Sequence, residues 1–132
     1  MDYNDEHALE TYKSLISIST EALKALQLVN GGAVVALLAY LGQAADRVTL
    51  AGQVKCPLAL FVSGLVTATA AFIPSYLTQL ALYNEDVHTA QYKGVKHQNW
   101  LNVALALALL SLAAFAFGAF GAVSALAHGT GK

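Results

Sequence analysis

The stretch that decides the fold is VALALALLSLAAFAFGAFGAVSALA, from Val103 to Ala127, which contains no charged side chain. The uncharged region around it extends from Gln98 to Gly131. A helix needs about 20 apolar residues to cross the hydrocarbon core of a bilayer, which is about 30 Å thick. This stretch meets that requirement, so we predict a membrane span at residues 102–126.

Two further stretches also lack charge. Residues 56–84 read CPLALFVSGLVTATAAFIPSYLTQLALYN and predict a second span at 57–80. Residues 25–45 read ALQLVNGGAVVALLAYLGQAA and predict a weaker span at 28–45, because polar and glycine residues interrupt its first half.

Composition supports a membrane protein. Hydrophobic residues make up 57% of the 132 residues and charged residues 11%, whereas soluble domains have about 45–50% and about 25%. So short a chain cannot bury two fully apolar helices in a core of its own. The low charge excludes an ordinary soluble enzyme, and the net charge of −1 excludes a basic nucleic-acid-binding protein. The single cysteine, Cys56, excludes an internal disulfide and a cysteine zinc site.

The predicted fold class is therefore all-α. We expect one integral membrane domain over residues 1–132, with three transmembrane helices preceded by an amphipathic helix at 5–27. That helix has apolar residues at helical spacing on one side, namely Leu9, Tyr12, Ile16, Leu23 and Leu26. The membrane surface, the rest of the protein or another chain could cover this side, and we favour protein because the opposite face carries few bases. The helix either continues into the first span or bends at Asn30-Gly31-Gly32.

The predicted connections are residues 44–55 and a polar loop at 84–101. Pro57 suits the first turn of the second span. Pro74 frees the carbonyl of Ala70 and predicts a kink. Nearby hydroxyls could satisfy such freed groups; they belong to Thr67, Thr69, Ser75 and Thr78. The aromatic residues expected at the membrane interface are Tyr83, Tyr92 and Trp100.

Asn30 is the polar residue that stands out within a span. It could line a pore or specify an oligomer, or it could simply form a hydrogen bond with a neighbouring helix. Residues that permit close helix packing or bend a helix are the other packing or pore candidates; they are Gly31, Gly32, Gly64, Pro74, Gly118 and Gly121.

No set of residues predicts catalysis, a metal site or a cofactor. The histidines are His7, His88, His97 and His128. Glu85 and His88 have the spacing of a carboxylate metal site on a helix, but no second cluster of ligands accompanies them. We therefore expect a protein that is not an enzyme and binds no cofactor.

The run Glu21-Ala22-Leu23-Lys24-Ala25-Leu26, followed by Asn30-Gly31-Gly32-Ala33 and Ala36-Leu37-Leu38-Ala39, resembles a group of small, uncharacterised bacterial membrane proteins. The resemblance implies a protein of the bacterial inner membrane. It implies no functional residues.

Two functions fit these features. The first is a small oligomeric protein that forms a pore or perturbs the membrane. The second is an accessory subunit that packs beside a larger membrane complex, such as a respiratory or photosynthetic assembly. Membrane lipids and either further copies of the chain or a larger complex are the expected partners. Four lysines on the side of the N-terminus, against three basic residues on the other side, favour a cytoplasmic N-terminus.

Overall fold

The computed structural model describes residues 3–43, 47–87 and 94–129. Within these ranges all the regular structure is helical. The four helices are α1 (Tyr3–Gln43), α2 (Arg47–Ala70), α3 (Phe72–Val87) and α4 (His97–Gly129). The all-α prediction is confirmed.

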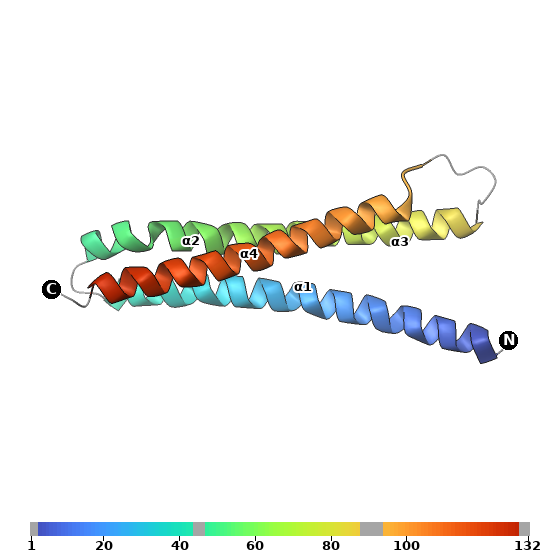
Figure 1. The fold of residues 1–132 in the computed structure, drawn as a ribbon, viewed down its shortest axis with the longest axis horizontal. Coiled ribbons are helices and arrows are strands. Elements are labelled where there is room, and N and C mark those ends of the chain that lie inside the picture. The colour runs from blue at the N-terminus through green and yellow to red at the C-terminus, as the bar shows by residue number, and fades with distance from the viewer. Residues whose placement is uncertain (1–2, 44–46, 88–93, 130–132) are drawn as a thin grey trace.

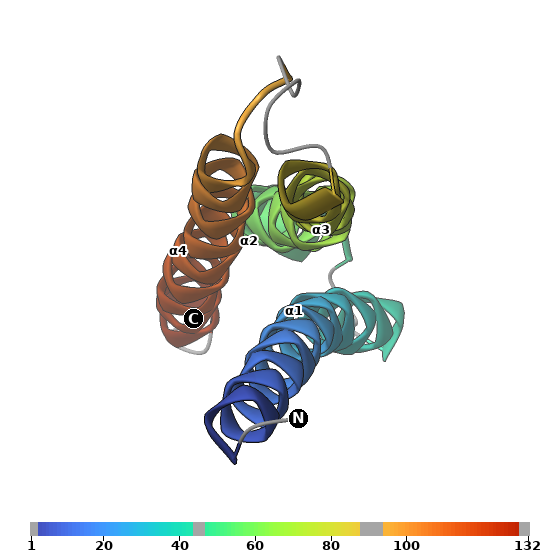
Figure 2. The ribbon, with the colours of Figure 1, turned by 90° about the vertical axis from the view of Figure 1, so that its right-hand side faces the viewer.

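The helices form an elongated antiparallel bundle (Figure 1). α3 continues the direction of α2, and α4 runs back alongside both. α1 packs mainly against α2, whereas its N-terminal half diverges from α3 and α4 (Figures 1 and 2). The start of α1, the end of α3 and the start of α4 lie at one end of the bundle. We call this the N-terminal end of the bundle.

The three expected spans are found. Helical segments long and apolar enough to cross a membrane occupy Leu9–Gln43, Ala51–Val87 and His97–Ala127, and most of each faces outward. The accessible surface is 9067 Å², whereas a compact soluble protein of 13.8 kDa exposes about 6,600 Å². So much outward-facing apolar surface suits lipid rather than water as the surrounding medium.

α1 is continuous through Asn30-Gly31-Gly32, so the N-terminal helix continues into the first span. Its 41 residues extend about 62 Å, twice the thickness of a bilayer core. The predicted amphipathic character of residues 5–27 is not confirmed. Leu23 is buried, but Ile18, outside the predicted apolar side, is also a large apolar residue and is 64% exposed. Apolar side chains are therefore not confined to one side of this half of α1.

The helices extend further than the sequence predicted at both connections. α2 begins at Arg47, so Pro57 lies well inside the helix and not in its first turn. Most of the predicted connection at 44–55 is helical for the same reason. At the other connection, α3 continues to Val87 and α4 begins at His97, so the predicted loop at 84–101 is helical at both ends. Charged and polar residues end an apolar stretch of sequence. They do not end the helix itself when the helix extends beyond the bilayer.

The second span is interrupted at Ala71, three residues before Pro74, and the kink expected at Pro74 stays a prediction. α2 ends at Ala70 and α3 begins at Phe72. The amide of Ala71 donates to Thr67 O at 3.0 Å and the amide of Ser75 to Ala71 O at 3.2 Å, so regular hydrogen bonding continues on both sides. The predicted compensation differs: the hydroxyls of Ser75 and Thr78 donate to Ala71 and Pro74 carbonyls, each four residues back, and not to Ala70.

The apolar core lies between α1, α2 and α4, toward the end of the bundle opposite the N-terminus. Its buried members are Leu37, Val54, Phe61 and Ala122. The ring of Phe61 packs against that of Phe115 with 5.7 Å between centroids and a 53° tilt. Such a tilted aromatic pair is favourable beyond its burial.

Candidate functional site

The principal candidate site is a buried polar cluster formed by Asn30, Gly64 and Ser111, which come from α1, α2 and α4. Asn30 and Ser111 are both 0% exposed. Their side chains are joined by a hydrogen bond from Asn30 Nδ2 to Ser111 Oγ of 3.2 Å. Ser111 Oγ donates in turn to the carbonyl of Gly64 at 2.8 Å. The cluster therefore connects all three spans through one chain of hydrogen bonds.

The cluster satisfies its donors and leaves one acceptor unpaired. Asn30 Nδ2 also donates to Leu26 O of its own helix at 2.9 Å. Asn30 Oδ1 is buried and receives no hydrogen bond among the described residues. It faces the Cα of Gly64: a Cβ there would lie 2.7 Å from Asn30 Cγ and 3.0 Å from Nδ2, and closer still to Oδ1. The backbone of Gly64 therefore lies close against the amide of Asn30, as is typical of closely packed membrane helices.

This geometry separates the two interpretations of Asn30. The side chain faces the other two helices of its own protomer, as expected of a hydrogen bond to a neighbouring helix. No part of it reaches the outer surface of the protomer. The sequence identified Asn30 as a polar residue deep in a span, but its bond to Ser111, 81 residues away, gives no local signal.

Two of the predicted glycines also lie at close helix contacts. A Cβ on Gly118 of α4 would come 3.0–3.2 Å from the ring of Phe61 on α2. A Cβ on Gly121 would come 3.2 Å from the ring of Pro57. Both contacts are tighter than an ordinary van der Waals distance, so these positions favour glycine because α2 and α4 approach closely there.

The remaining predicted packing residues differ from one another. Gly31 is half-buried, and a Cβ added there would lie 3.8 Å from Leu65 of α2, which leaves room for a small side chain. Gly32 is exposed, and a Cβ added there would meet no other part of the protein within 4 Å. Pro74 is buried in the first turn of α3. Of the interface aromatics, Tyr83 is 63% exposed and Trp100 is half-buried, whereas Tyr92 lies outside the described residues.

Glu85 has a partner that the sequence did not indicate. Its Oε1 accepts a 2.8 Å hydrogen bond from the backbone amide of His97, and its Oε2 lies 2.7 Å from His97 Nδ1. Glu85 thus caps the first turn of α4 and connects it to α3. His88, its partner in the predicted metal spacing, lies outside the described residues. Among the described residues no three histidine, cysteine or acidic side chains are grouped as metal ligands.

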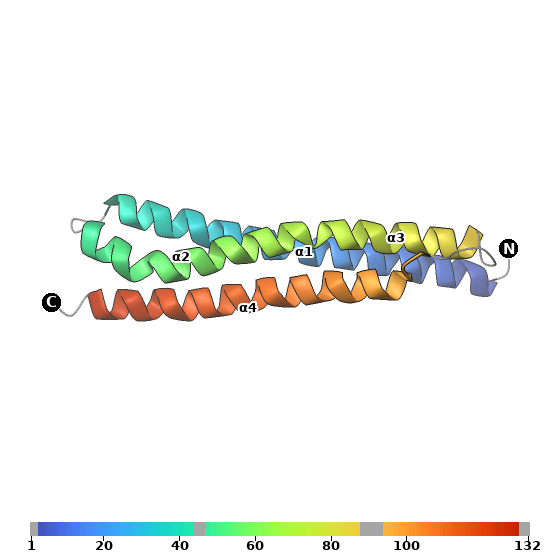
Figure 3. The same cartoon turned by 90° about the horizontal axis from the view of Figure 1, so that it is seen from above.

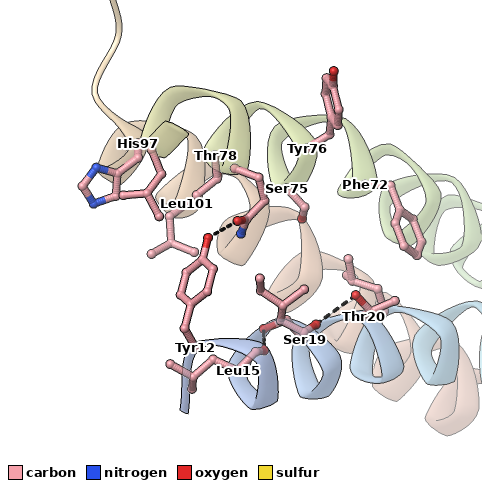
Figure 4. A pocket seen from close by; sticks show the side chains of 14 residues that line it. Tyr12, Leu15, Ser19, Thr20, Phe72, Ser75, Tyr76, Thr78, His97 and Leu101 are labelled. Carbon is pink, nitrogen blue, oxygen red and sulfur yellow. Dashed lines mark hydrogen bonds between the residues drawn. The ribbon is translucent and has the colours of Figure 1, made fainter. Parts of the chain in front are cut away.

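An apolar groove at the N-terminal end of the bundle is a second feature that the sequence did not reveal. It separates the N-terminal half of α1 from α3 and α4 and has a volume of about 530 Å³ (Figure 4). Tyr12 crosses it and donates a hydrogen bond to Gln79 Oε1 on α3. The groove exists because α1 diverges from α3, which depends on the packing of whole helices.

The chain was compared with models of protein families, with curated proteins and with solved structures, and none of the three comparisons finds a match.

Proposed function

We propose that this chain is a non-enzymatic accessory subunit that packs, through the apolar outer surfaces of its helices, beside a larger complex in the bacterial inner membrane. The observation that supports this proposal is the inward direction of the buried polar cluster. Asn30 and Ser111 use their hydrogen bonds within the protomer. The outer surface that remains is dominated by large apolar residues, which suit packing against other membrane helices.

The exposed aromatic residues of α4 are the strongest candidates for that contact. Phe117 and Phe120 are 67% and 75% exposed on the side of α4 away from the core. Membrane helices associate through van der Waals packing, and large rigid rings provide extensive contact for little loss of conformational entropy. In an oligomer, further copies of this chain would pack on the same surface instead.

Purification of the tagged chain at its native expression level, in a mild detergent, tests this proposal. Co-purification with other subunits in a fixed ratio is the expected result. Phe120→Ala should reduce that recovery, whereas Leu28→Ala, at an equally exposed position on α1, should not. A closed ring containing this chain alone would contradict the accessory-subunit proposal.

A pore between protomers is the second candidate, and one observation favours it. Gln27 Nε2 donates to Thr69 Oγ1 at 3.0 Å in an exposed position between α1 and α2. Such a polar pair on the outer surface could line a water-filled passage between copies. Expression should then dissipate the membrane potential, and Gln27→Leu should restore it. If expression leaves the potential intact and no ion flux is measured, the pore is excluded.

We propose a cytoplasmic N-terminus from the distribution of lysines described above. Cysteine accessibility tests it without disturbing the cluster. A cysteine at Glu6, with Cys56→Ser to remove the native thiol, should react with a membrane-impermeant maleimide only after the membrane is opened.

A further inference from the structure

The groove between α1 and α3 has the dimensions of one hydrocarbon chain. It extends along α1 from Tyr12 to Leu23, which is about 16 Å of helix. One leaflet contributes about half of the 30 Å hydrocarbon core, so the groove is about as long as one leaflet is thick. Its volume of about 530 Å³ lies within the range of small-molecule sites.

Several residues that line the groove carry hydroxyl groups, but these hydroxyls do not make the groove polar. Ser19 and Thr20 of α1 donate to the carbonyls of Leu15 and Ile16. Ser75 and Thr78 of α3 likewise donate to carbonyls four residues back. The hydroxyl protons are therefore used within each helix, and the space between them is bounded mainly by carbon, with Phe72 pointing toward α1 (Figure 4).

A polar recess of about 410 Å³ adjoins the outer end of the groove. The two cavities share Tyr12, Gln79 and Leu82, and the recess adds Tyr83 and Asp86. Asp86 has no ion-pair partner within the described parts of the chain. A carboxylate beside two tyrosine rings and an amide oxygen matches the requirements of an ammonium group, which forms ion pairs, cation–π contacts and hydrogen bonds.

The surrounding charge favours the same ligand. Apart from the Glu21–Lys24 pair, the described side chains at the N-terminal end of the bundle include four acids, which are Glu6, Glu10, Glu85 and Asp86. They include two lysines, which are Lys13 and Lys96. An anionic head group would be repelled by this balance of charge, whereas an ammonium group would be attracted.

We propose that the groove and its recess bind one membrane lipid with an ammonium-bearing head group, with an acyl chain between α1 and α3 and the ammonium at Asp86. The acyl chain lies along the groove toward Leu23, and the head group lies at the end of the groove where the recess with Asp86 adjoins it. This site is independent of whether the protein acts as a subunit or as an oligomer.

Reconstitution tests the proposal directly. The full chain is placed in nanodiscs of equal amounts of dioleoyl phosphatidylethanolamine and dioleoyl phosphatidylglycerol, which have the same acyl chains and differ in the head group. After transfer to a mild detergent, native mass spectrometry should detect one retained lipid per protomer, with the ethanolamine lipid several times more abundant. Equal retention of the two lipids, or retention of neither, overturns the proposal.

Paired variants locate the site. Ser75→Phe fills the groove and should abolish retention. Ser63→Phe is the matched control, because the Ser63 hydroxyl also donates within its own helix but is exposed on α2, away from the groove. Asp86→Asn should preserve retention but remove the head-group preference. Retention by Ser75→Phe at the level of the unmodified protein overturns the proposal.

These measurements test the lipid site only if each variant is folded. Circular dichroism and a monodisperse elution profile check each one. If Ser75→Phe fails these checks, Ile16→Trp fills the groove from its opposite wall and must give the same loss of lipid. A folded Ile16→Trp that still retains the lipid overturns the proposal.

Discussion

Asn30 of α1 and Ser111 of α4 are 81 residues apart in the sequence, and a 3.2 Å hydrogen bond joins their side chains in the middle of the bundle. Because Ser111 also donates to Gly64 O, this bond fixes α1, α2 and α4 at one relative height. Sliding any one of these helices by a turn would leave buried polar groups unpaired, which is costly where no water can replace the lost partner.

Ser111→Ala should destabilise the bundle by about 1 kcal/mol. It removes the donor to Gly64 O and one partner of Asn30, and hydrogen bonds between membrane helices contribute about 0.6–2 kcal/mol. Unfolding in mixed micelles with increasing dodecyl sulfate measures the change. Ser63→Ala is the control, since that exposed hydroxyl bonds only to Leu60 O of its own helix. Equal losses in the two variants would mean that the bond between helices contributes nothing.

Gly64→Ala should be more harmful, by about 1–3 kcal/mol, because the new methyl group would overlap the side chain of Asn30. Gly32→Ala should have the opposite sign. Its Cβ meets no atom within 4 Å, and alanine is favoured over glycine in a helix interior by about 0.5–1 kcal/mol. The same denaturation assay compares both variants.

Combining Gly64→Ala with Asn30→Ala should cost less than the sum of the two single changes. The methyl group on residue 64 then occupies part of the space that the amide has left. Strict additivity in this double-mutant cycle would contradict the close contact between Gly64 and Asn30.

Glu85→Gln should loosen the first turn of α4. The carboxylate accepts the His97 amide and contacts its ring, and negative charge is favourable at a helix N-terminus. Hydrogen exchange at the amides that follow His97 should accelerate, while exchange around Ser111 should remain unchanged. Glu10→Gln serves as the charge-matched control. Unaltered exchange at the start of α4 in Glu85→Gln would show that the cap is unnecessary.

Pro74→Ala should make the second span one uninterrupted helix. The new amide at position 74 can donate to the Ala70 carbonyl, which proline leaves without its usual donor. Protection of that amide from hydrogen exchange, measured by NMR in micelles, is the expected result. An exchange rate like that of an unstructured amide would mean that the interruption at Ala71 has a cause other than the proline.

The membrane spans could be predicted because an uncharged stretch of sufficient length is a property of local sequence. The ends of the helices could not, since Lys55 and Glu85 stop the apolar pattern while the helices continue to Arg47 and Val87. Pro57 illustrates the same difficulty. It resembles a residue of the first helical turn, but it lies inside α2, packed closely against Gly121 of α4.

The polar cluster was predictable only in part. Asn30 and Gly64 stood out as unusual residues within spans, but which helix each one faces is decided by how three helices pack. The groove was beyond prediction for a related reason. Tyr12 and Gln79 are 67 residues apart, and the space near them depends on the angle at which α1 leaves the bundle.

The separation of Asn30 and Ser111 also determines a step in biogenesis. Ribosomes add about 5–20 residues per second, so Ser111 follows Asn30 out of the ribosome by roughly 4–16 s. For that interval the first helix has been synthesised and the partner of its amide has not. Until the last helix arrives, Asn30 Nδ2 has only its bond to Leu26 O of its own helix, and the bond that joins the first and last spans forms only after α4 has entered the bilayer.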